Sequence, residues 1–136
     1  MRFIDTNIFL RYLTRDDEIK AAACFELFQR LQSGTETATT CEAVIAEVVY
    51  VLSARAHYHL SPEDIRTRLR PLLSVRGLKL FQKKLHLRAL DLYASYPFLD
   101  FEDALSAAYM EKQGLTEILS YDTDFDRVSG IVRQEP

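Results

Sequence analysis

The sequence contains little cysteine and no long apolar run. Cys24 and Cys41 are the only two cysteines among 136 residues, and each falls in a helical pattern. Neither a disulfide framework nor a thiolate metal site is therefore expected. No apolar stretch approaches the roughly 18 residues of a membrane span, and the charges of Arg2, Asp5 and Arg11 do not match a secretory signal. We expect a soluble cytoplasmic protein with no membrane partner.

Histidine is scarce as well, and two common catalytic motifs are missing. The three histidines, His57, His59 and His86, lie in a basic part of the chain, away from the acidic motifs described below. We expect all three on the surface. No Gly-x-Ser-x-Gly motif and no phosphate-binding loop are present, so the sequence gives no support to a serine hydrolase or a P-loop enzyme.

The composition fits one compact domain spanning residues 1–136. Apolar residues make up 48% of the chain, enough for a core without covalent staples. The formal charge is −3, but residues 55–88 alone carry +7 and the rest −10. This asymmetry suits a phosphate-binding surface beside an acidic pocket, although solvated helix faces would look the same. The candidate RNA-binding side chains are Arg66, Arg70, Arg76, Lys79, Lys83 and Lys84.

Hydrophobic periodicity predicts strands and helices that alternate along the chain. Ser61 and Asp17 are suited to begin helices, and Gly34 and Gly114 to end them. Such alternation predicts an α/β fold with a mostly parallel central sheet and helices on both faces. Strands are expected at 2–4, 35–40, 78–81, 117–120 and 130–133, and helices at 8–13, 17–33, 42–56, 62–73, 83–96 and 101–113.

Acidic residues follow two of these strands and interrupt two of the helices. Asp5 and Asp122 come directly after strands, where open parallel sheets bind ligands. Glu47 has apolar neighbours three and four positions away, so we expect it on or beside a buried face, where an unpaired charge is costly. Asp103 lies in the first turn of a helix. Simple capping of turns and helices would also explain Asp5, Asp100 and Asp122, and the dipole of the helix would explain Asp103 in its first turn.

The run Asp122-Thr123-Asp124-Phe125-Asp126 superficially suggests a calcium loop. An EF-hand requires glycine at the sixth position and glutamate at the twelfth, but Arg127 and Arg133 occupy them here. Calcium binding of this type is therefore excluded.

Four segments together resemble the PIN-domain ribonucleases of the VapC toxin type. The segments occur in the family's order and at similar spacing, in a chain of similar size, and the resemblance spans essentially the full length. They are residues 4–9 (Ile-Asp-Thr-Asn-Ile-Phe), 46–52 (Ala-Glu-Val-Val-Tyr-Val-Leu), 100–105 (Asp-Phe-Glu-Asp-Ala-Leu) and 120–126 (Ser-Tyr-Asp-Thr-Asp-Phe-Asp).

The resemblance implies a set of site residues and partners. The implied catalytic and metal-holding residues are Asp5, Glu47, Asp103 and Asp122, with Asp124 and Asp100 as further candidates and Thr6 and Asn7 in support. The resemblance also implies an RNA substrate, a homodimer and a small antitoxin whose tail enters the active-site groove.

The chemistry expected of such a site is hydrolysis assisted by Mg²⁺ or Mn²⁺. These cations take oxygen ligands and assist phosphodiester cleavage by activating water. Two alternatives remain open: an inert PIN-like module that binds RNA or protein, and a non-toxin PIN nuclease in RNA processing. A phosphatase of the haloacid-dehalogenase type is disfavoured, because Asn7 stands where that family's second aspartate would be.

Overall fold

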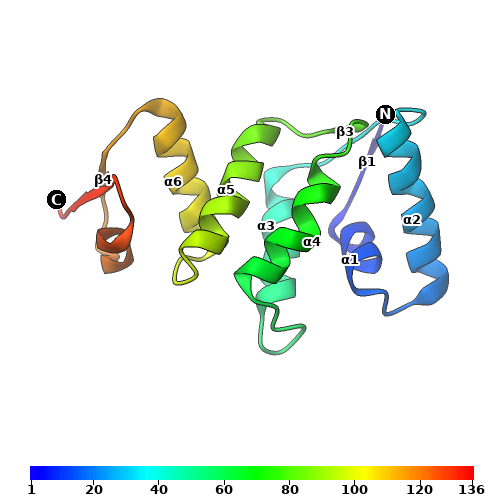
Figure 1. Ribbon diagram of the computed structural model, residues 1–136, viewed down its shortest axis with the longest axis horizontal. Coiled ribbons are helices and arrows are strands. Elements are labelled where there is room, and N and C mark those ends of the chain that lie inside the picture. Colours follow the sequence, from blue (N-terminus) through cyan, green and yellow to red (C-terminus); the bar gives the residue numbers. More distant parts are fainter.

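The computed structural model describes all residues from Met1 to Pro136 and contains six α-helices (Figure 1). None of the helices combines the length and the apolar character needed to cross a membrane. The helices are α1 (Thr6–Thr14), α2 (Glu18–Ser33), α3 (Glu42–Ser53), α4 (Pro62–Leu73), α5 (Lys83–Ser95) and α6 (Phe101–Gln113). The strands are β1 (Arg2–Phe3), β2 (Ala38–Thr39), β3 (Leu78–Lys79), β4 (Glu117–Leu119) and β5 (Val132–Gln134), and a 3-10 helix, η1, covers Thr123–Arg127.

The ends of the helices follow the capping residues in the sequence. The carboxylate of Asp17 accepts a hydrogen bond from the Lys20 N–H at 3.1 Å, and the hydroxyl of Ser61 accepts one from Asp64 N–H at 3.1 Å. Gly34 ends α2 with φ 79°, a left-handed conformation that glycine adopts without strain. These predicted helix ends are confirmed.

Three short parallel strands form the first sheet, in the order β1-β2-β3. Arg2 is paired with Ala38, and Ala38 with Leu78. The hydroxyl of Thr40 donates to the carbonyl of Ile4 at 2.9 Å and ties the end of β1 to the end of β2. The strands predicted at residues 35–40 and 78–81 are present but shorter.

The hydrophobic core is built from residues of this first sheet and of all six helices. Its 26 buried residues run from Ile4 to Ala108 and include the fully buried Phe9 of α1 and Leu52 of α3. Gly77 marks a close approach of backbones, since a Cβ there would lie 2.4 Å from the carbonyl oxygen of Glu36. A side chain at that position would push β3 away from the segment that leads into β2.

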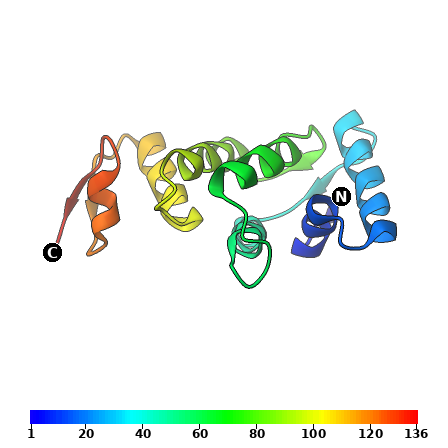
Figure 2. The ribbon, with the colours of Figure 1, turned by 60° about the horizontal axis from the view of Figure 1, so that its bottom comes forward.

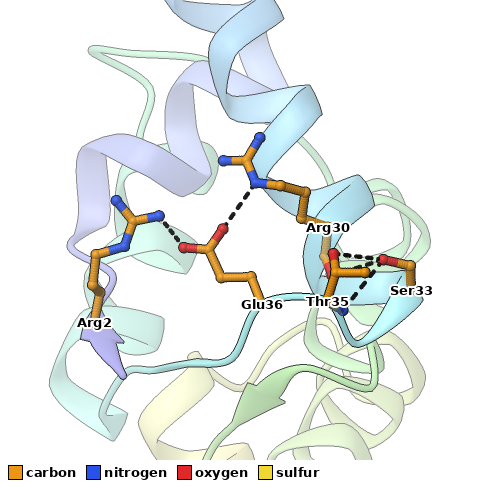
Figure 3. A network of polar contacts seen from close by, with 5 residues as sticks. All are labelled: Arg2, Arg30, Ser33, Thr35 and Glu36. Carbon is orange, nitrogen blue, oxygen red and sulfur yellow. Dashed lines mark hydrogen bonds and ion pairs between the residues drawn. The ribbon is translucent and has the colours of Figure 1, made fainter.

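One carboxylate joins the start of the first sheet to α2 (Figure 3). Glu36 accepts hydrogen bonds from Arg2 of β1 and from Arg30 of α2, the latter at 2.9 Å. These two hydrogen bonds lower the pKa of the Glu36 carboxyl. Beside them, the hydroxyls of Ser33 and Thr35 lie 3.0 Å apart.

The strands β4 and β5, together with η1, form a separate C-terminal unit. They make a two-stranded parallel sheet in which Ile118 pairs with Arg133. In both views this unit lies at the opposite end of the elongated molecule from β1, α1 and α2 (Figure 1 and Figure 2). The expected parallel strands are therefore present, but they fall into two sheets. The last strand also begins two residues later than predicted, at Val132.

His86 departs from the sequence prediction. His57 and His59 are exposed as expected, but His86 is 2% exposed. It belongs to the apolar face of α5, where Leu85 and Ala89 are also buried. Its Nδ1 lies 3.0 Å from the Gln82 carbonyl oxygen, whereas its Nε2 has no hydrogen-bond partner.

Candidate functional site

The first acidic motif lies where β1 runs into α1. Asp5 occupies the N-cap position of α1, with φ −90° and ψ 168°, yet its side chain makes no capping hydrogen bond. Helix capping therefore does not account for this carboxylate, which is exposed. Thr6 is buried and Asn7 is exposed. The β1–α1 turn thus presents an unengaged carboxylate at the carboxyl end of a parallel strand, the position where such sheets bind ligands.

A hydrogen bond connects this turn with the second acidic motif. The hydroxyl of Thr6 donates to Oε2 of Glu47 on α3 at 2.8 Å. Glu47 was expected on or beside a buried face, and it lies beside one with its side chain exposed. The apolar neighbours Val44 and Val48 point into the core, and Glu47 lies on the edge of that face. The contact brings the motifs around residues 5 and 47 together.

The two remaining acidic motifs meet at the other end of the molecule. Asp100 caps α6 by accepting the N–H of Asp103 at 2.8 Å, and Asp122 caps η1 by accepting the N–H of Asp124 at 2.9 Å. Burial, the charge of Asp100 and a hydrogen bond to it raise the pKa of the Asp103 carboxyl to about 6, with smaller contributions from the charges of Asp122 and Asp124. Capping is therefore confirmed for Asp100 and Asp122, and four carboxylates still share one region.

The structure thus contains two acidic groups. One comprises Asp5 and Glu47 with Thr6, and the other comprises Asp100, Asp103, Asp122 and Asp124. No three carboxylate, histidine or cysteine side chains lie in an arrangement that could hold a metal ion. The donors nevertheless have the right chemistry for Mg²⁺ or Mn²⁺, because a carboxyl whose pKa is raised by neighbouring carboxylates lies in an excess of negative charge.

Some of the predicted basic side chains make hydrogen bonds within the protein, and others are exposed to solvent. Arg66 and Arg70 of α4 both donate to Asp91 of α5, at 2.7 and 2.9 Å. Lys79 and Lys83 donate to backbone carbonyls at 3.2 and 2.9 Å. Burial, and then the charge of Lys79, lower the pKa of the Lys83 amine. Two of the predicted arginines are therefore engaged in joining helices. Arg76 and Lys84 are exposed.

A basic hollow lies between the start of α5 and the end of α6. Its volume is about 590 Å³, and it is lined by Lys83 and Lys84, as well as Arg88 and Lys112. Arg88 is paired with Glu111 at 2.9 Å. Arg88 and Lys112 were missed by the sequence analysis. Arg88 ends the basic segment and could have been included, whereas nothing in the sequence joins Lys112 to that segment.

Two solved structures are similar to this chain over nearly its whole length. VapC20 of Mycobacterium tuberculosis, a toxin that cleaves the sarcin–ricin loop, is 21% identical with all of both chains covered and a TM-score of 0.40. VapBC2 from Rickettsia felis, bound to a DNA fragment from its promoter, is 16% identical over 98% of this chain and 97% of the other, with a TM-score of 0.37.

Comparison by sequence gives a firmer result. A search of curated proteins found no significant match. The model of the PIN domain family, by contrast, matches residues 2–131 and so includes all four acidic motifs and nearly the full chain. This match confirms the expected fold class, and the chain belongs to the PIN domain family.

Proposed function

We propose that this protein is an endoribonuclease of the VapC toxin type that uses Mg²⁺ or Mn²⁺ and is neutralised by a cognate antitoxin in the cytoplasm. The proposal rests on membership of the PIN domain family and on the resemblance of the four acidic motifs to VapC toxins. Hydrolysis of RNA phosphodiester bonds is the reaction to which such acidic sites are suited.

The observation that carries the proposal is the charge around Asp103. Its carboxyl has a pKa raised to about 6 by burial and by the carboxylates of Asp100, Asp122 and Asp124. Concentrating acids in this way destabilises a protein unless a cation is present to balance them. Residues from α6 and from the turn after β4 are brought together by the fold at this cost. Binding of a cation would explain why the fold brings these carboxylates together despite their repulsion.

The two acidic groups have complementary tasks in this mechanism. Asp103 and Asp122 supply carboxylates that would hold the cation, and Asp5, at the other end of the molecule, is a carboxylate that is not used for capping. Thr6 fixes the orientation of Glu47 through its hydroxyl. When bound, Mg²⁺ or Mn²⁺ would supply a water of lowered pKa and stabilise the leaving oxygen.

Binding of the RNA backbone falls to the basic hollow. Lys83, Lys84, Arg88 and Lys112 contribute positive charge from two helices. Contacts of this kind act on phosphates and give affinity without reading base sequence. The identity of the cleaved RNA therefore depends on shape and on other contacts.

A second candidate is an inert PIN module that binds RNA or a protein without cleaving it. It is favoured by one observation, namely that no three potential ligands are arranged to hold a metal ion within the chain. A non-toxin nuclease of RNA processing would use the same residues and differ from a toxin only in target and partner.

The test is cleavage of total cellular RNA by protein freed of any co-purified partner, with and without Mg²⁺ or Mn²⁺. We expect discrete products that require metal, and we expect Glu47→Gln to reduce their formation at least about 100-fold. Glu26→Gln is the matched control, because Glu26 is an exposed acid on α2 outside the four motifs. Metal-dependent RNA binding without products in the wild type would support the inert module instead.

A further inference from the structure

The C-terminal unit has the surface of a sheet that is missing a neighbour. Parallel sheets in known folds are covered, and two strands alone are marginally stable. Here β4 and β5 pair only with each other. Leu119 is 70% exposed, Val132 55%, and Tyr121, just after β4, 72%. An apolar, parallel, two-stranded sheet with this much exposure needs a partner.

The first sheet has an open edge as well. Its order is β1-β2-β3, so β1 has no neighbour on its outer side. The N–H of Ile4 donates to Thr39 on β2 at 2.8 Å, and alternation along a strand therefore turns the peptide groups of Phe3 outward. Phe3 is 57% exposed. A strand edge with unpaired N–H and C=O groups and an exposed aromatic side chain can pair with a strand of another chain.

Within one chain, the C-terminal unit is held away from this edge. The guanidinium of Arg127 lies 3.8 Å from the ring centroid of Phe98, and the N–H of Ser129 donates to the Tyr96 hydroxyl at 3.3 Å. Phe98 and Tyr96 belong to the connection between α5 and α6, so the unit is anchored there. In both views β4 and β1 lie at opposite ends of the molecule (Figure 1 and Figure 2).

We propose that β4 of a second copy of this chain pairs in parallel with β1, and that each active site is completed by carboxylates from both copies. This inference rests on the proposed function for its catalytic consequence. Parallel pairing aligns the carboxyl ends of the two strands. Asp5 follows β1 and Asp122 follows β4, so the pairing brings Asp5 and Glu47 of one copy to Asp103 and Asp122 of the other.

The size of the exposed surface agrees with such an exchange. The chain exposes 7907 Å², whereas a compact monomer of 15.7 kDa is expected to expose about 7,300 Å². The excess of roughly 600 Å² approaches the roughly 800 Å² that each partner buries in a standard interface. Exchange in both directions gives a two-fold symmetric dimer with no strand edge left open at β1 or β4.

Disulfide cross-linking tests the pairing without any need for activity. Phe3→Cys and Leu119→Cys are made separately, each with Cys41→Ser because Cys41 is exposed, then mixed and mildly oxidised. Neighbouring strands lie about 4.8 Å apart, within the reach of a disulfide. We expect a covalent dimer containing one chain of each kind, and little cross-linking of either variant alone.

Two results would overturn the inference. The first is the absence of the mixed dimer. The second is an intramolecular disulfide as the only product of a single chain carrying both cysteines, since this would show that the C-terminal unit closes on its own β1. If either substitution impairs folding, light scattering on the unmodified protein can still overturn the inference, because strand exchange requires a dimer. A mass of one 15.7 kDa chain contradicts the proposal, and twice that mass is expected.

Complementation tests the shared active site. Asp5→Asn and Asp122→Asn are each expected to be inactive, but after co-refolding half of the dimers contain one chain of each kind. Each mixed dimer has one intact site, so about a quarter of wild-type cleavage should return. No recovery, beside an active wild type, would contradict a shared site. An inactive wild type that still forms the mixed disulfide would overturn the proposed function and leave the strand exchange standing.

Discussion

The hydroxyl of Thr6 joins two acidic motifs that lie 41 residues apart. Thr6 is 6% exposed and Glu47 is exposed, so the hydrogen bond runs from the core to the surface. A buried donor holds a surface carboxylate in one place, which a freely rotating side chain could not achieve. The role of Thr6 is therefore to position the Glu47 carboxylate.

Replacing Thr6 by valine should impair activity more than stability. The shape is nearly kept, so we expect a loss of about 1 kcal/mol in the free energy of unfolding and a roughly tenfold fall in cleavage rate, because Glu47 loses its donor. Urea unfolding and RNA cleavage measure the two effects. Thr14→Val is the control, since the Thr14 hydroxyl donates to Leu10 within the same helix. Equal activity losses in both variants would contradict the positioning role.

The raised pKa of Asp103 predicts how stability depends on pH in the absence of metal. The pKa of this carboxyl is about 6 in the folded protein against 3.8 for the free group. The stabilising contribution of the protonated form is therefore fully present below pH 3.8 and is lost as the pH rises through 6. Asp103 is half-buried, so solvent screening reduces the effect to roughly 1 kcal/mol.

Urea unfolding of wild type and Asp103→Asn between pH 4 and pH 8 measures this contribution. The wild type should lose stability relative to the variant as the pH rises, and the variant should be the more stable protein at pH 8. Asp64→Asn, at an exposed site on α4, should follow the wild type. If the difference in free energy of unfolding between wild type and Asp103→Asn stayed constant from pH 4 to pH 8, the raised pKa of Asp103 would be contradicted.

Helices α4 and α5 are connected through one carboxylate. Asp91 accepts hydrogen bonds from Arg66 at 2.7 Å and from Arg70 at 2.9 and 3.2 Å. Burial opposes ionisation of Asp91, but the hydrogen bonds from the two arginines outweigh it and lower its pKa. The stability that this group contributes is thus present at neutral pH and is lost as the pH falls through its lowered pKa.

Asp91→Asn should destabilise the protein by about 1–2 kcal/mol, because both arginines lose a charged acceptor. Chemical denaturation at pH 7 gives this value. The control is Glu63→Gln, whose carboxylate lies 3.9 Å from Arg66 at an exposed position and should cost less than about 0.5 kcal/mol. If both substitutions cost the same, the connection between α4 and α5 does not depend on Asp91.

The hydrophobic core and the C-terminal unit are packed separately. All 26 residues of the core cluster lie between Ile4 and Ala108, and none comes from β4, η1 or β5. The unit buries Phe125 and Val128 on its own side. Folding of the larger part should therefore not require residues beyond α6.

A fragment comprising residues 1–114 should fold. It should unfold cooperatively in urea with a free energy of unfolding lower by roughly 3–6 kcal/mol, which corresponds to the lost burial of two apolar side chains. It should also be monomeric and inactive, because both Asp122 and the exchanging strand are absent. Circular dichroism and light scattering follow these properties. A disordered fragment would show that the C-terminal unit is needed for the core.

Local signals accounted for most elements and for the candidate residues. Asp17, Ser61 and Asp100 cap helices as predicted, because capping depends on neighbours within three residues. The side chain of His86 was assigned the wrong exposure, since it is buried. Helical spacing shows which residues share a face, but the packing of other elements decides whether that face is covered.

The sequence by itself determined the family, the order of the elements and the four acidic motifs, since these depend on short-range pattern and on residue chemistry. Only the tertiary structure decided that the strands form two sheets, that Thr6 holds Glu47, and that Asp103 shares a region with Asp122. Contacts between distant residues decide such features, because a strand edge can pair with any compatible edge that reaches it.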